Sequence, residues 1–268
     1  MEAPPDVPPQ IPPQAAPLGP PAGPVVMHQR WRRLLFLHWR VDPAAVQALL
    51  PEGLRVHTHD GHAAPGESAW IGVVPFLMRG VRPRFLPPVP GLSDFEELNL
   101  RTYVLGPDGR PGVWFFSLDA NQRLAVAIAR RLFRLPYEHA RVATTGHIDG
   151  SLTFDCLRRG ADPRSACRFR YRGVGEPAPA RPGTLDAFLV ERYLLYAWDD
   201  RRRRLSVGRV DHEPYRLQRA EVPVGDDALF AVDALPGVGR PGRPWDHAAF
   251  SPGVDVRIHP LRGIRSAG

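Results

Sequence analysis

The sequence predicts an α+β domain built mainly from an antiparallel β-sheet or β-barrel, with a few short helices. Three observations carry this prediction. About ten segments have the aromatic and β-branched character of strands, tight turns with Gly and Pro separate many of them, and only three or four segments have helical character. Because 43% of the 268 residues are hydrophobic, the chain can bury a full core.

The first 26 residues are predicted to be a disordered, proline-rich tail. They include ten prolines, no aromatic residue and two charged residues, so they cannot bury enough surface to offset the entropy lost on ordering. Residues 27–268 contain no internal repeat and no second linker. We therefore expect them to form a single domain.

The first elements of this domain are strands with one short helix between them. Residues 33–41 have the composition of a strand. Residues 42–53 follow as a helix, because Asp42 is a typical N-cap, Pro43 suits the first helical position and a Pro-Glu-Gly run ends the segment. Two more strands are predicted at 54–61 and 68–83.

A hairpin in the middle of the chain is the clearest local signal. Residues 98–105 and 110–119 are rich in aromatic and β-branched residues and flank a Gly-Pro-Asp-Gly turn. Residues 121–135 then have the periodicity of an amphipathic helix. The remaining segments are predicted, in order, as a hairpin over 143–173, a short helix running into a strand over 183–200, strands over 204–210 and 215–222, a helix over 226–235 and a strand over 254–260.

The two cysteines test the predicted register of the hairpin over 143–173. If that hairpin turns at its Gly-Ala-Asp-Pro sequence, residues whose numbers sum to 323 face each other, and Cys156 and Cys167 satisfy this condition. No apolar run is long enough for a membrane span or a secretory signal. We therefore expect a cytoplasmic protein without a membrane partner, in which both thiols stay reduced.

The net charge of +7 comes from arginine alone, because the chain contains no lysine. The arginines are spread through the predicted strands, so a nucleic-acid partner is not favoured. His57, His59 and His62 cluster at a strand end that we interpret as a solvated loop, and no metal site is predicted. The sequence lacks the common nucleotide, hydrolase and zinc-protease motifs, so no cofactor is predicted. A homo-oligomer is left open.

Polar side chains on the central hairpin are the best candidates for a functional site. With a period of two, Glu97, Asn99 and Arg101 project from one face, and Ser117 and Asp119 share a face of the next strand. Two interpretations stay open. In one, the face is an outer surface with an ion pair, and Asp119 or Asn121 is the N-cap of the following helix. In the other, the face lines a barrel pocket with Glu97 and Asp119 as acid–base groups and Asn99, Arg101 and Ser117 as ligand contacts.

Arg131 also needs an explanation, because it falls within the apolar arc of the predicted helix, beside Leu124 and Ile128. A guanidinium on a buried face has to be paired or hydrogen-bonded. One reading is a structural salt bridge with Asp119 or Glu97. The other is a site that binds a carboxylate or enolate-like oxygen of a ligand through the bidentate fork of the guanidinium.

Six segments resemble, in order, the YqjF-like family of uncharacterised bacterial proteins, also catalogued as domain of unknown function 2071. The segments are WRRLLFLHWRVDPAAVQALLPEGL, WIGVVPFLMRGVRP, FEELNLRTYV, PGVWFFSLDA, RRLFRLPY and PGTLDAFLVERYLLY. The resemblance covers residues 28 to 262, approximately. It implies that residues 27–268 are one YqjF-like domain and that the 26 preceding residues are an appendage.

This family is similar in fold to acetoacetate decarboxylase. The resemblance therefore implies a β-rich barrel or cone around an apolar pocket, with a helix that carries the reactive group. In that enzyme a desolvated lysine beside a second cation forms a Schiff base, and Arg130 and Arg131 lie near the place expected for the lysine pair. Since this chain has no lysine and a guanidinium does not replace an amine, no side chain can form a Schiff base.

The resemblance thus implies a pocket for a small acidic or carbonyl-bearing molecule, without lysine Schiff-base chemistry. The anionic end of such a molecule is expected at Arg131 or Arg101. The alternative is a non-catalytic binding or interaction protein in which the polar residues form a structural, buried Arg–carboxylate network.

Overall fold

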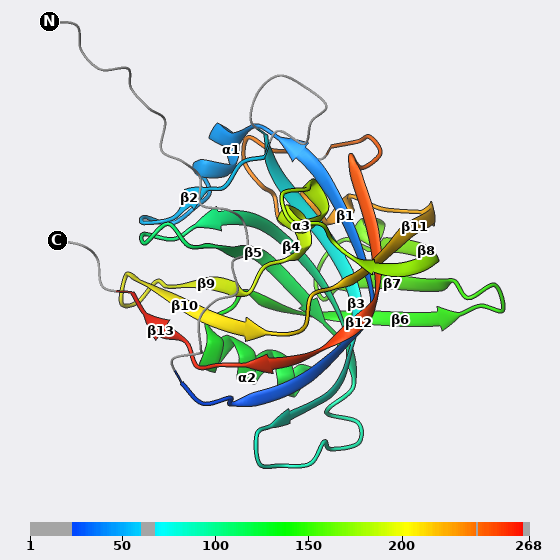
Figure 1. Ribbon diagram of the computed structural model, residues 1–268, viewed down its shortest axis with the longest axis horizontal. Helices are drawn as coiled ribbons and strands as arrows, with labels where there is room; N and C mark the ends of the chain where they lie inside the picture. Colours follow the sequence, from blue (N-terminus) through cyan, green and yellow to red (C-terminus); the bar gives the residue numbers. More distant parts are fainter. Residues whose placement is uncertain (1–22, 60–67, 240, 265–268) are drawn as a thin grey trace, which may run out of the picture.

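A computed structural model describes residues 23–59, 68–239 and 241–264. In this part of the chain, 13 strands form one sheet, accompanied by short helices (Figure 1). The strands are β1 (Met27–Val41), β2 (Arg55–Val56), β3 (Ala69–Pro83), β4 (Phe95–Leu105), β5 (Pro111–Ala120), β6 (Tyr137–Gly146), β7 (Leu152–Arg158), β8 (Cys167–Pro179), β9 (Leu194–Asp199), β10 (Arg204–Asp211), β11 (Arg216–Val224), β12 (His247–Ile258) and β13 (Arg262–Gly263). The helices are α1 (Pro43–Gln47), α2 (Arg123–Phe133), α3 (Leu185–Val190), α4 (Ala228–Val232) and the 3-10 helix η1 (Pro163–Ser165).

The sheet closes on itself because β4 pairs with both β3 and β5. The pairings run from β5 through β6, β7, β8, β11, β12, β1 and β3 back to β4. A second route leads from β5 through β9 and β10 to β12. Strands β12, β1, β3, β4 and β5 therefore form a wall that two closed compartments share. The pairings of β5 with β6 and β9 are parallel and the other strand pairings described are antiparallel, as the predicted fold class requires.

This shared wall explains the nearly continuous apolar sequence of strands such as β3. Alternate side chains of a strand point to opposite faces, and in the wall both faces are buried. Val74 and Phe76 belong to one apolar cluster, whereas Val73 packs in the other cluster together with Leu98 and Leu100 of β4. The sequence therefore has few polar positions in these strands, and the exceptions are candidates for function.

Several local predictions can be compared with the structure. Cys156 and Cys167 are paired across β7 and β8, which confirms the predicted register, and both are buried free thiols. The N-cap of α2 is Gln122, whose side chain accepts a hydrogen bond from the backbone N–H of Leu124, so the prediction that Asp119 or Asn121 caps this helix is wrong. Residues 1–22 of the predicted tail lie outside the described residues.

No helix in the described part of the chain is long and apolar enough to cross a membrane.

Candidate functional site

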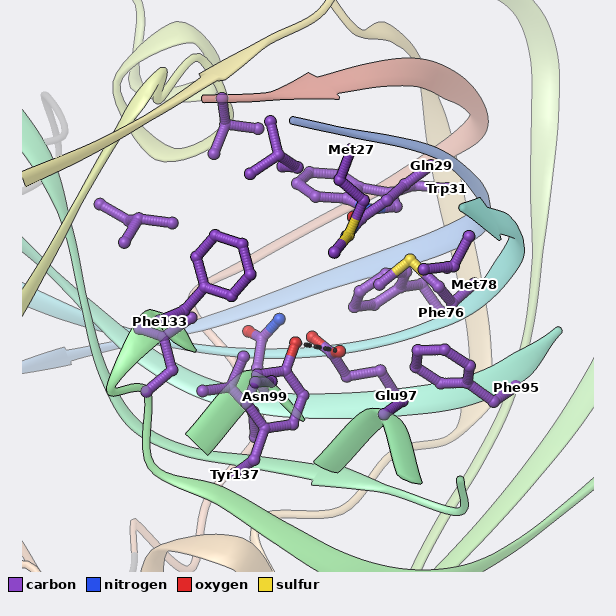
Figure 2. Close-up of a pocket in the computed structure, with 18 of the residues that line it drawn as sticks. Met27, Gln29, Trp31, Phe76, Met78, Phe95, Glu97, Asn99, Phe133 and Tyr137 are labelled. Carbon is purple, nitrogen blue, oxygen red and sulfur yellow. Dashed lines mark hydrogen bonds between the residues drawn. The ribbon is translucent and has the colours of Figure 1, made fainter. Parts of the chain in front are cut away.

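A cavity of about 630 Å³ lies in the compartment that β9 and β10 close. Its volume falls within the range of small-molecule pockets, about 300–1,000 Å³. Apolar side chains of β1, β3, β4, β5 and α2 form most of its wall (Figure 2). Its polar lining comes mainly from Gln29, Ser93, Glu97, Asn99, Arg101, Tyr137, Arg192 and Tyr215. The site is therefore a deep apolar cavity with a few polar groups from neighbouring elements.

Glu97, Asn99 and Arg101 alternate along β4 and all line the cavity, as the period of two predicts. Figure 2 shows Glu97 and Asn99 projecting into it from β4. The hydroxyl of Tyr137 donates a hydrogen bond to Glu97 Oε2 at 2.8 Å. Asn99 also hydrogen-bonds Glu97, while Asn99 Oδ1 has no hydrogen-bond partner among the described residues. This oxygen is therefore a buried acceptor whose hydrogen-bonding capacity the described residues leave unused.

The carboxyl of Glu97 titrates near neutral pH. Burial raises its pKa from 4.5 to about 7, because the charged form loses its hydration in the apolar cavity. Hydrogen bonds from Tyr137 and Asn99 act in the opposite direction, and the charge of Asp119 adds to the rise. Glu97 can therefore give or take a proton at physiological pH, which is the property of a general acid or base.

Two buried arginines line the cavity farther along β4. Arg101 and Arg192 are 8% and 7% exposed, and neither has an ion-pair partner within the described ranges. Nη2 of Arg101 donates to the carbonyl of Leu189 at 3.1 Å, but Nε of Arg101 and both Nε and Nη2 of Arg192 have no hydrogen-bond partner there. The nearest carboxylate in sequence, Glu191, is engaged by the hydroxyl of Tyr193 and the backbone N–H of Tyr215.

Both guanidinium groups lie over aromatic rings: Arg101 over Phe36 and Tyr103, and Arg192 over Tyr103 and Phe188. The guanidinium of Arg192 lies 4.3 Å from the ring centroid of Phe188, a cation–π contact. Burial lowers the pKa of Arg192 to about 9, and the positive charge of Arg101 adds to this effect. Two desolvated cations whose N–H donors have no partner among the described residues are costly to bury. A bidentate carboxylate or another anion would satisfy them.

Tyr103 lies beside both arginines and begins a chain of hydrogen bonds that ends at Asp186. Tyr103 donates to the carbonyl of Leu189 at 2.8 Å, so the ring nitrogen of His38 at 2.6 Å has to donate to the Tyr103 oxygen. The other nitrogen of His38 then accepts from His247 at 2.9 Å. His247 donates in turn to Asp186 at 2.7 Å. Burial lowers the pKa of His38, in keeping with a neutral ring that donates through one nitrogen and accepts through the other.

Ser117 and Asp119 lie outside the cavity, on the opposite face of β5. A register shift between Leu100 and Arg101 places a bulge in β5, so that Phe115 and Leu118 both line the cavity. Asp119 is therefore opposite Leu98, and Ser117 is opposite Leu100. The expectation that these two side chains share a face with Glu97 is wrong, because the sequence does not reveal the bulge.

Asp119 instead belongs to a buried ion-pair network. Nε and Nη2 of Arg158 both contact Asp119, each at 2.7 Å, and Nη1 of Arg158 contacts Asp233. Ser117 donates to Asp233. Although burial raises the pKa of Asp119, Arg158 counteracts this shift. This network matches the structural Arg–carboxylate alternative, but on the far side of the wall from the cavity.

Arg131 is exposed on α2, so the expectation that it lies on a buried face is wrong. Leu124, Ile128 and Leu132 of this helix line the cavity and are also exposed to solvent. The apolar face that includes Arg131 is therefore not buried in the core. Arg130 forms an ion pair with Glu138 at 2.7 Å. The arginine pair on the helix is thus not the cationic pair of the cavity.

His57 is buried and does not lie in a solvated loop. Its ring centroid is 4.8 Å from that of Phe188, and burial lowers its pKa to about 3. His62 lies outside the described residues. No group of three or more metal-ligating side chains is arranged to hold an ion in the part of the chain that the structure describes.

Sequence reasoning missed Arg192 and Tyr137. Arg192 follows the apolar segment Leu189–Val190 and precedes another, Leu194–Leu195. A charge between two apolar runs is a signal of burial, and a buried charge needs a partner. Tyr137 carries no comparable signal, since aromatic residues are common at the start of strands.

The titration of Glu97 makes stability depend on pH. The pKa of Glu97 is about 7 in the folded state and 4.5 in the unfolded state. The protonated carboxyl therefore adds its full contribution to the free energy of unfolding below pH 4.5, and this contribution is lost as the pH rises to 7. We expect Glu97→Gln, which stays neutral, to gain about 2 to 3 kcal/mol relative to the parent between pH 5 and pH 8. Urea unfolding of both proteins at the two pH values measures this; an identical difference at both would contradict it.

Comparison with known sequences identifies the family. A sequence profile of DUF2071, described as "Uncharacterized conserved protein", matches residues 28–255. The uncharacterized protein YqjF of Bacillus subtilis (strain 168) is 39% identical to this chain over 238 residues, which cover 88% of this chain and 92% of YqjF.

Solved structures with a similar fold are distant in sequence. The enduracididine biosynthesis enzyme MppR, complexed with the condensation product of pyruvate and imidazole 4-carboxaldehyde, has a TM-score of 0.60 at 15% identity, and the match covers 94% of this chain and 92% of that chain. Acetoacetate decarboxylase from Legionella pneumophila has a TM-score of 0.57 at 13% identity, covering 93% and 92%. These likenesses concern the fold alone. The profile match and the similarity to YqjF show that the chain belongs to the DUF2071 family, on an acetoacetate-decarboxylase-like fold.

Proposed function

We propose that this protein binds a small organic acid, with the carboxylate held by Arg101 and Arg192 and the apolar body in the cavity. The observation that carries the proposal is the pair of buried guanidinium groups, which have free N–H donors and no carboxylate partner among the described residues. A ligand carboxylate would supply the missing charge and accept these hydrogen bonds. The mostly apolar wall favours a ligand that carries a hydrocarbon portion.

The positions along β4 suggest which other groups the ligand carries. Asn99 lies between Arg101 and Glu97, and its free Oδ1 accepts a hydrogen bond from a hydroxyl, enol or N–H group. The Cα atoms of Glu97 and Arg101 are about 13 Å apart at the usual rise of a strand. A ligand that contacts both side chains therefore lies along β4, across Asn99.

Glu97 is the acid–base group of the proposed site. With a pKa of about 7 it can protonate a carbonyl oxygen or accept the proton of a hydroxyl or enol. The names of two structural neighbours support a small organic acid as the ligand. One is a complex with a condensation product of pyruvate, and the other is acetoacetate decarboxylase. Without lysine, the chemistry cannot pass through a lysine Schiff base.

The alternative, a non-catalytic protein with a structural Arg–carboxylate network, is supported by the contacts of Arg158 with Asp119 and Asp233. That network does not account for Arg101 and Arg192, which lie on the other side of the wall and pair with neither aspartate. An enzyme and a non-catalytic binding protein would both bind the acid at Arg101 and Arg192. They differ in whether Glu97 exchanges a proton with the bound acid.

Thermal unfolding of the full chain with octanoate, 3-hydroxyoctanoate and octan-1-ol tests the binding step. At a ligand concentration of about 100 times Kd, the native state gains about 2.7 kcal/mol, which corresponds to a rise in Tm of about 5–10 °C. We expect both acids to raise Tm and the alcohol to have little effect. Because Asn99 can accept a hydrogen bond from the hydroxyl, the parent should bind 3-hydroxyoctanoate more tightly than octanoate. Asn99→Leu should lose this preference and keep octanoate binding. Equal shifts for the acids and the alcohol, or none, would contradict the proposal.

A further inference from the structure

The mouth of the cavity is bordered by exposed apolar side chains. They come from the β3–β4 connection and from α2, which Figure 1 shows at the same end of the molecule. Six of them line the cavity and are nevertheless between 40% and 64% exposed: Leu86, Val89, Leu92, Leu124, Ile128 and Leu132. We call these six residues the apolar rim. Phe85, beside it, is 84% exposed.

The two parts of the apolar rim are joined by a hydrogen bond. Nε2 of Gln122, the N-cap residue of α2, donates to the carbonyl of Gly91 at 2.8 Å. On α2, the residues Leu124, Ile128 and Leu132 recur every four positions and form one stripe. Val126 is the buried residue of this helix, so the stripe faces the mouth and the solvent instead of the core. A contiguous apolar surface of this kind marks a site of contact with another body.

The charges around the apolar rim are mainly positive; the exposed acidic residue beside it is Asp94, whose carboxylate accepts a hydrogen bond from the backbone N–H of Gly80 at 2.7 Å. Arg84, Arg123 and Arg131 are exposed and take part in no ion pair among the residues that the structure describes. Segments 84–92 and 123–133 contain no acidic residue. The other arginines nearby, Arg130 and Arg134, are already paired with Glu138 and Asp199.

This combination of charge and apolar surface fits one kind of partner. A second copy of the chain, docked rim to rim, would bring the unpaired arginines of both copies together, which disfavours it. The surface of an anionic bilayer offers phosphate groups for the arginines and hydrocarbon for the leucines. Surface-lying helices with leucine on one face and arginine beside it bind such membranes.

We infer that the apolar rim is a docking surface for an anionic lipid bilayer, and this inference replaces the expectation from the sequence that the protein has no membrane partner. The leucines enter the boundary between headgroups and acyl chains while Arg84, Arg123 and Arg131 contact lipid phosphates. The mouth of the cavity then opens toward the bilayer, and an amphipathic acid can enter it without crossing water. This loading route rests on the proposed function, whereas the docking does not.

Co-sedimentation of the full chain with lipid vesicles tests the docking. Vesicles of mixed phosphatidylglycerol and phosphatidylcholine are compared with vesicles of phosphatidylcholine alone. We expect binding to the anionic vesicles, with at least about a tenfold loss for Arg123→Gln combined with Arg131→Gln, since each basic residue near an anionic surface contributes a factor of about five. Leu124→Gln combined with Leu132→Gln should weaken binding comparably. Because all four side chains are exposed, the variants should melt like the parent.

Two control variants separate docking from unspecific attraction. Arg55→Gln combined with Arg164→Gln removes the same charge from exposed positions on β2 and η1, and Ile148→Gln removes an exposed apolar side chain from the β6–β7 turn. We expect both to bind like the parent. The inference is overturned if the parent does not bind anionic vesicles, or if the control variants lose as much binding as the rim variants. It is also overturned if the only effect of the leucine substitutions is to dissociate a dimer in sedimentation velocity. A Tm shift with octanoate but no vesicle binding would reject the docking and keep the proposed function; vesicle binding without any Tm shift would do the reverse.

Discussion

Arg192→Leu is expected to weaken octanoate binding by about a hundredfold or more, while leaving the free energy of unfolding unchanged or higher. Arg192 offers two N–H groups that have no partner among the described residues, and each hydrogen bond to a charged group contributes about 1.5–3 kcal/mol. Their loss corresponds to about a hundredfold weaker binding or more. Stability is not expected to fall, because the change removes a buried cation that no carboxylate compensates. Isothermal titration calorimetry and urea unfolding measure the two quantities.

Arg192→Lys is the matched control for this variant. Lysine keeps a positive charge but lacks the planar fork that binds a carboxylate at two points. We therefore expect intermediate affinity. If Arg192→Leu binds octanoate as tightly as the parent, the carboxylate does not occupy the arginine pair.

Arg158→Leu is expected to destabilise the protein by about 3–5 kcal/mol without weakening octanoate binding. Arg158 is the cation of a buried network, and its removal leaves Asp119 and Asp233 close together without a counter-charge. The pKa of Arg158 is raised by these partners, as expected for a guanidinium held by two carboxylates. Urea unfolding at neutral pH measures the change.

Arg168→Leu is the control for Arg158. Arg168 pairs with Asp155 at an exposed position, where ion pairs contribute little to stability, so we expect almost no change. Equal stability losses for Arg158→Leu and Arg168→Leu would contradict a structural role of the network. Loss of Arg158 should lower stability and leave octanoate affinity unchanged, whereas loss of Arg192 should lower octanoate affinity and leave stability unchanged or higher. This contrast distinguishes an arginine paired within the protein from one that binds the ligand.

The sequence predicted the parts of the fold that depend on local patterns. The strands, the hairpin around the Gly-Pro-Asp-Gly turn and the pairing of Cys156 with Cys167 follow from alternation and turn chemistry. The direction of Glu97, Asn99 and Arg101 into one cavity follows from the period of two along β4. These properties extend over a few residues, and tertiary contacts did not change them.

Other properties depend on contacts between distant segments, which local patterns do not contain. The bulge in β5 turns Ser117 and Asp119 away from the cavity, and Arg158, which holds Asp119, lies 39 residues away. The apolar stripe of α2 borders a mouth and not the core, so Arg131 is exposed although its neighbours are apolar. Arg192 joins the site only because β9 pairs in parallel with β5.

A crystal structure of the full chain grown with octanoate tests the anion site most directly. The proposed function predicts electron density for the acid inside the cavity, with its carboxylate oxygens within hydrogen-bond distance, about 2.7–3.1 Å, of the guanidinium groups of Arg101 and Arg192. Its hydrocarbon chain should run toward α2. Density with the carboxylate at the exposed arginines of α2, or bound acid only outside the cavity, would contradict the account.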